Sequence, residues 1–119
     1  MKESIHKYFQ VGTIQWMSHP NYEVLDSLRR IASDEYFDAV EVCKFGDDET
    51  RKKARDLLEQ SHLKVCYGAQ PRLLGPKLNP NDVDEAGRKK AEETLLEAVD
   101  EAEYLGAKGI AFLAGKWQE

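Results

Sequence analysis

Short apolar segments rich in β-branched and aromatic residues alternate with longer amphipathic segments along this chain. The apolar segments predict strands over residues 9–17, 38–45, 64–70 and 109–114. Between them, apolar residues recur at helical spacing over residues 22–33, 49–61 and 84–105. A strand, a helix and a further strand in succession form a right-handed crossover between parallel strands. The pattern therefore predicts an α/β fold with four parallel strands, a (βα)3β unit.

The third predicted helix is the longest, and a polar loop with several prolines, residues 71–84, leads into it. Its continuous apolar stripe consists of Ala91, Leu95, Ala98, Val99, Ala102 and Leu105. Gly106 follows as a C-terminal stop, because glycine adopts the left-handed conformation that ends many helices. For the first helix we expect Asn21 as the N-cap, and for the second Asp48 or Thr50 near the cap.

Either a doubly wound sheet or a curved segment of a barrel accommodates this pattern. On the second predicted strand, Val40 and Val42 share a face suited to helices, whereas Glu41 and Cys43 point the other way. A buried carboxylate is costly unless it is paired or faces a wet cavity, such as the rim of a barrel lumen. The strand pattern thus favours a barrel. At this length we expect residues 1–119 to form one domain.

The composition is that of an ordinary globular chain, with 41% hydrophobic and 33% charged residues. No apolar run approaches the ~20 residues needed to span a bilayer, and the N-terminus lacks a signal-peptide core. We therefore expect a cytoplasmic protein with no membrane partner. The net charge is −5 and the basic residues are scattered, which disfavours nucleic-acid binding. Cys43 and Cys66 fit no zinc spacing and are expected to be buried, reduced thiols.

Ligands of parallel α/β folds bind beyond the C-terminal ends of the strands. The residues predicted to bind substrate there are Trp16, Glu41, Tyr67, Gln70, Arg72 and Lys116. Aromatic rings, amides, a carboxylate and cations together suit a hydroxylated or phosphorylated small molecule. Alternatives stay open for four of them: Trp16 as a core aromatic, Glu41 as a partner of Lys44 or Arg72, and the two cations Arg72 and Lys116 as solvated side chains.

Motifs of other chemistries are absent from the sequence. There is no dinucleotide-binding glycine pattern, phosphate-binding loop or nucleophile elbow. His62 is expected at the end opposite the site, in a structural role, and His19 is the one histidine predicted on the site's side. No three or four metal-ligating side chains converge, so we assign neither a metal ligand nor a catalytic residue to this chain.

Three segments carry a resemblance to a known family. They are Val40-Glu41-Val42, the Arg88-x-x-Ala91 spacing at the start of the third helix, and Leu105-Gly106-Ala107-Lys108 at the turn into the fourth strand. Together they resemble the first half of xylose isomerase-like TIM barrels, the sugar-phosphate isomerases and epimerases. The resemblance implies a Glu41 that faces the site. It also implies that an intact parent enzyme moves a proton α to a carbonyl with a divalent metal (Mg, Mn, Zn or Co), held by strands five to eight.

The resemblance leads to the first functional expectation. The chain would be the N-terminal half of a sugar or sugar-phosphate isomerase or epimerase, and would supply its substrate-contacting wall. The alternative is a catalytically inactive half-barrel fragment that forms homo-oligomers through its open strand edges. A flavodoxin-like or response-regulator-like module is a weaker third possibility, since no acidic pair follows the first strand. A zinc endonuclease is disfavoured, because Tyr67-Gly68 and Leu113-Ala114 stand where such enzymes carry histidines.

Overall fold

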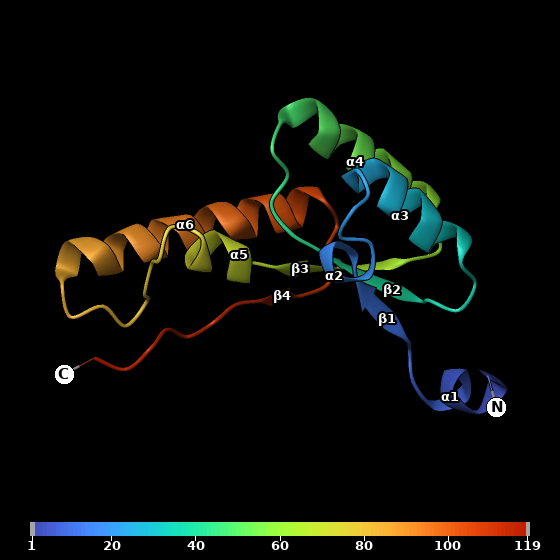
Figure 1. Cartoon of the computed structure of the whole chain (residues 1–119), viewed down its shortest axis with the longest axis horizontal. Coiled ribbons are helices and arrows are strands. Elements are labelled where there is room, and N and C mark those ends of the chain that lie inside the picture. The colour runs from blue at the N-terminus through green and yellow to red at the C-terminus, as the bar shows by residue number, and fades with distance from the viewer. Residues whose placement is uncertain (1, 119) are drawn as a thin grey trace.

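The sheet has four parallel strands in the order β1-β2-β3-β4. The computed structural model describes residues 2–118, and Figure 1 shows their arrangement. The elements are α1 (Lys2–Tyr8), β1 (Gly12–Ile14), α2 (Gln15–Ser18), α3 (Val24–Ser33), β2 (Ala39–Val42), α4 (Asp48–Gln60), β3 (Lys64–Gly68), α5 (Gln70–Leu74), α6 (Glu85–Tyr104) and β4 (Ile110–Ala111). The predicted α/β fold with four parallel strands is confirmed. The sheet is not closed, and β1 and β4 are its two edges.

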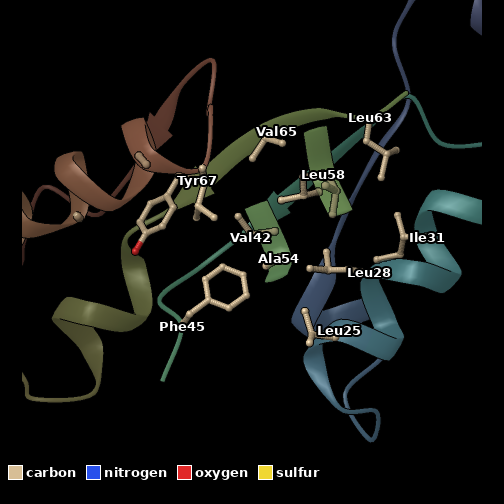
Figure 2. Packing of buried hydrophobic residues seen from close by; sticks show 14 of the residues in the cluster. Leu25, Leu28, Ile31, Val42, Phe45, Ala54, Leu58, Leu63, Val65 and Tyr67 are labelled. Carbon is tan, nitrogen blue, oxygen red and sulfur yellow. The ribbon is translucent and has the colours of Figure 1, made fainter. Parts of the chain in front are cut away.

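The three long helices α3, α4 and α6 lie on the same side of the sheet (Figure 1). The register aligns Val40 with Val65 and Val42 with Tyr67, so these side chains share one face. They pack with Leu28 and further apolar residues of all three helices in a single core, part of which is drawn in Figure 2. The sheet therefore buries its Val40–Val42 face beneath helices, as the alternation on β2 predicts.

The opposite side of the sheet carries Ile14, Glu41 and Cys66, which are aligned by the register, and Gly68 two residues further along β3. We call this side the Glu41 face. Glu41 and Cys66 are half-buried there, whereas the flanking core valines are buried. The alternation of a strand thus separates an apolar face for helices from a face with a carboxylate and a thiol.

Side-chain caps fix where the helices begin. Glu23 caps α3 by accepting hydrogen bonds from the backbone N–H groups of Leu25 and Asp26, so the prediction of Asn21 is wrong. Asp47, one residue before the predicted position, caps α4 through Thr50. Both acidic caps also interact favourably with the positive end of the helix dipole.

The end of α6 follows the prediction. Gly106 has φ +75°, and Ala107 donates its N–H to the carbonyl of Ala102. This is the hydrogen bond of a Schellman motif, for which a residue without a Cβ is preferred at the left-handed position.

All four strands are shorter than predicted, the first and fourth most of all, and the loop after β3 also differs. The first strand is limited to Gly12–Ile14, because the buried Gln15 turns into α2 and donates a hydrogen bond to Ser27 Oγ of α3. The proline-rich loop begins with a short helix, α5. The fourth strand is limited to Ile110–Ala111, and beyond it Asn79 and the side chain of Gln118 join the chain to the 79–83 loop.

Glu101 connects α6 to the rest of the fold. Its carboxylate accepts hydrogen bonds from the backbone N–H of Phe45 (2.9 Å) and the hydroxyl of Tyr67 (3.3 Å). It also pairs with Arg72, whose Nε donates to the Tyr67 hydroxyl at 2.9 Å. The Arg72 and Glu101 side chains are 6% and 3% exposed. The helix therefore contacts the end of β2, β3 and α5 through one buried carboxylate.

Among the described helices, none is both long and apolar enough to cross a membrane.

The Glu101 network yields a stability prediction. Glu101→Gln should lower the free energy of unfolding by about 3–5 kcal/mol, because it removes the buried carboxylate that pairs with the buried Arg72 charge. Glu97 also pairs with Arg72, at 3.5 Å, but its side chain is 69% exposed. Glu97→Gln is the matched control and should cost no more than about 1 kcal/mol. Urea unfolding of both variants measures the difference, and equal losses would contradict the account.

Candidate functional site

Three side chains from separate elements converge above Gly68 on the Glu41 face. A Cβ built on Gly68 would lie 2.7 Å from Gln70 Oε1, 2.8 Å from the Trp16 ring at Cη2 and 3.1 Å from Glu41 Oε2. These side chains come from α5, α2 and β2. The site thus has a carboxylate, an amide and an aromatic ring around one glycine, at the C-terminal ends of β1, β2 and β3.

The local folds explain this convergence. Glu41 points to this face by the alternation on β2, and Trp16 follows β1 on a helical turn whose first residue, Gln15, bonds to α3. Gln70 follows β3 after one residue and begins α5, where Pro71 occupies the first turn and does not need a hydrogen-bond partner for its nitrogen. Each of these three side chains therefore lies on a strand or within two residues of its end.

The two polar groups of this site lack donors. Among the side chains of residues 5–118, none donates a hydrogen bond to the half-buried Glu41 carboxylate, and Gln70 Oε1 is buried without a partner. Arg72, which the sequence offered as a partner for Glu41, pairs with Glu101 and Glu97 instead. Because unsatisfied buried acceptors are costly, the site favours a ligand that brings hydrogen-bond donors.

The charge of the site also affects Cys43, which follows β2. Burial, together with the neighbouring carboxylates of Glu101 and Glu41, raises the pKa of its thiol to about 11 against the opposing effect of Arg72. A thiol with such a pKa remains protonated at neutral pH and is a poor nucleophile. The cysteine therefore contributes a neutral wall rather than a reactive group.

The remaining predicted site residues lie elsewhere. Tyr67 aligns with Val42 and so points to the helix face, where burial raises the pKa of its hydroxyl to about 12. Tyr67 and Arg72, two of the predicted substrate-binding residues, are hydrogen-bonded to each other within the Glu101 network. Lys116 is exposed on the segment after β4, and Asn79 binds its backbone N–H and carbonyl.

Two further observations concern the histidines and metals. His62 Nε2 lies 2.7 Å from the carbonyl of Phe37, at the N-terminal end of the sheet, in agreement with a structural role. His19 lies beside Ser18 and packs edge-on against Tyr22. In the part of the chain that the structure describes, no group of three His, Cys, Asp or Glu side chains is placed to hold a metal ion. The family resemblance assigns the divalent metal to strands five to eight rather than to these residues.

Sequence reasoning missed Glu101. Helical spacing offers the signal that finds it, since Glu101 lies three residues after Ala98 and four before Leu105, within the apolar stripe of α6. A carboxylate in such a stripe indicates a buried partner, which here is Arg72.

No family model matches this chain, and searches of curated proteins and of solved structures find no similar protein.

The convergence above Gly68 can be tested by filling its space. Gly68→Ala should displace the Trp16 ring or the Gln70 and Glu41 side-chain ends and cost about 1–3 kcal/mol of stability, as overpacking does. The emission of Trp16 should shift in a Trp117→Phe background, in which Trp16 is the sole tryptophan.

Gly46→Ala is the matched control, because a Cβ at Gly46 meets no atom within 4 Å. It should change stability by no more than about 0.5 kcal/mol and leave the emission unchanged. If the two alanine variants behave alike, Trp16, Glu41 and Gln70 do not converge above Gly68.

Proposed function

We propose that the Glu41 face binds a sugar or sugar phosphate, and that this chain is the substrate-contacting wall of an isomerase or epimerase. The observation that carries the proposal is the convergence of Trp16, Glu41 and Gln70 above Gly68. A sugar presents several hydroxyl donors and a C–H face, which match two acceptors without donors and an aromatic ring.

The arrangement of the sheet supports the finer proposal that the chain corresponds to half of a xylose isomerase-like TIM barrel. Parallel strands in sequential order with the long helices on one side are what a segment of such a barrel needs. The site also lies at the C-terminal ends of the strands, where TIM-barrel enzymes bind their substrates. The resemblance of Leu105-Gly106-Ala107-Lys108 adds the reaction class, proton transfer α to a carbonyl.

Within this function, each residue has a binding role. Glu41 accepts hydrogen bonds from adjacent hydroxyls, Gln70 Oε1 accepts one more, and the Trp16 ring packs against the C–H face of the sugar. These contacts orient the substrate without moving a proton. The reaction class of the proposal involves a divalent metal in the parent enzyme, which the resemblance assigns to strands five to eight, and no step here depends on it.

Glu41→Gln tests the binding role. Titration of the labelled protein with ribulose 5-phosphate or fructose 6-phosphate, followed by NMR, should shift the resonances of Trp16, Gly68 and Gln70. Loss of a charged acceptor should weaken binding by about tenfold or more, since hydrogen bonds to charged groups contribute about 1.5–3 kcal/mol. Glu59→Gln is a control, because Glu59 is exposed on α4. This variant should bind the sugar phosphate with the affinity of the unsubstituted chain. Unchanged affinity of Glu41→Gln would remove Glu41 from the site.

A second proposal concerns self-association. Parallel sheets are almost always covered on both faces, whereas α3, α4 and α6 all pack on one. The edges β1 and β4 have no further strand beside them within residues 2–118, and Met17, Phe112 and Leu113 are exposed nearby. These features favour pairing of two copies edge to edge. In that alternative, the chain is a catalytically inactive half-barrel that forms homo-oligomers.

A proline at the β4 edge tests self-association. Gly109 and Ala111 direct their carbonyls to β3, so the N–H of Phe112 points to the free edge by alternation. Phe112→Pro removes this donor and should yield monomers, whereas Phe112→Ala keeps it and should stay associated. Light scattering at micromolar concentration measures both. If the unsubstituted chain is monomeric, self-association is contradicted, and the proposal of a sugar site is unaffected.

A further inference from the structure

A groove lies beyond the C-terminal ends of β3 and β4, apart from the site above Gly68. One wall is α5 and the loop after it, from Leu73 to Pro80, and the other is the segment from Leu113 to Lys116. The groove encloses about 430 Å³, which is within the usual range for a small-molecule site.

Hydrogen bonds hold the two walls in place. The buried Asn79 side chain donates to the carbonyl of Lys116 at 3.0 Å and accepts from its N–H at 3.2 Å. Within the loop, Leu78 donates its N–H to the carbonyl of Leu73 at 2.8 Å. The groove is therefore formed before a ligand arrives, and little ordering is required for binding.

The lining of the groove is amphipathic. Its apolar part consists of Leu73, Leu74, Leu78, Pro80, Leu113 and Ala114. Leu74 and Leu113 are 61% and 45% exposed, so apolar surface remains in contact with water. The charged lining residues are Lys77 and Lys116, and no acidic residue lines the groove within the described part of the chain. In a chain of net charge −5, this places two cations beside an apolar channel.

We propose that the groove binds a single alkyl carboxylate of medium length, such as a free fatty acid, with its head at Lys77 and Lys116. The apolar walls match the alkyl chain, since each buried methylene contributes to transfer from water, and the lysines complement the negative head. The groove has chain on both sides and holds a limited volume, which suits one free molecule rather than a bilayer. This function is independent of the proposed sugar site.

Calorimetric titration of the protein with decanoate, below its micelle concentration, tests the proposal. Saturable binding of one molecule is expected, and it should weaken as salt is added. Trp117 follows Lys116 and is 78% exposed. In a Trp16→Phe variant, its fluorescence should change when decanoate binds in the groove. Absence of saturable binding would overturn the proposal.

Substitutions separate the two parts of the groove. Lys77→Gln with Lys116→Gln should weaken decanoate binding about fivefold or more, because two exposed charge interactions are lost, and should leave decanol binding unchanged. Lys64→Gln, an exposed change on β3, is the control and should bind decanoate as the parent does. Equal affinity of the double variant and the parent would overturn the assignment of the head group.

Anionic phospholipid vesicles distinguish a membrane surface from a free molecule. The protein should not sediment with such vesicles while it binds monomeric decanoate. Sedimentation with vesicles in the absence of any response to decanoate would overturn the proposal in favour of a lipid surface.

Discussion

The buried ion pair between Glu101 and Arg72 is the interaction on which the rest of the structure depends. Helix α6 buries mainly small residues, Ala91, Ala98 and Ala102, and these provide less apolar area than the leucines of α3. The Glu101 carboxylate adds a fixed point by binding the backbone of Phe45, the hydroxyl of Tyr67 and the guanidinium of Arg72. Since Arg72 lies on α5, two residues after Gln70, this network also connects α6 to the helix that carries Gln70.

The Glu101 network gives the two faces of the sheet different roles. One face packs against the helices in the core, where Tyr67 and Arg72 have a structural role. On the other, Gln70 Oε1 is buried without a donor among the described residues, and it converges above Gly68 with Trp16 and the half-buried Glu41. A fold that leaves acceptors unsatisfied gives up stability there, and such sites are typical of ligand binding. The division explains why an arginine that looked available in the sequence does not neutralise Glu41.

Much of the fold follows from the sequence, since the alternation of strands and helices predicts a parallel sheet and period-two spacing places Glu41 opposite Val40 and Val42. The same spacing applied to β3 groups Tyr67 with Val65 and would have assigned it to the core. The turn at Gln15 could not be read in this way, because it depends on a hydrogen bond to Ser27 on another element. The convergence above Gly68 likewise joins residues 16, 41 and 70, whose meeting depends on strand register rather than on any local pattern.

The central claim is that Trp16, Glu41 and Gln70 meet above Gly68 on the face opposite the helices. The most direct measurement is the nuclear Overhauser effect between the Trp16 ring proton at Cη2 and the α-protons of Gly68. The account predicts a strong cross-peak, because this ring carbon would lie 2.8 Å from a Cβ at Gly68. A Trp16 ring whose cross-peaks at that proton join it to α3 alone would contradict the account.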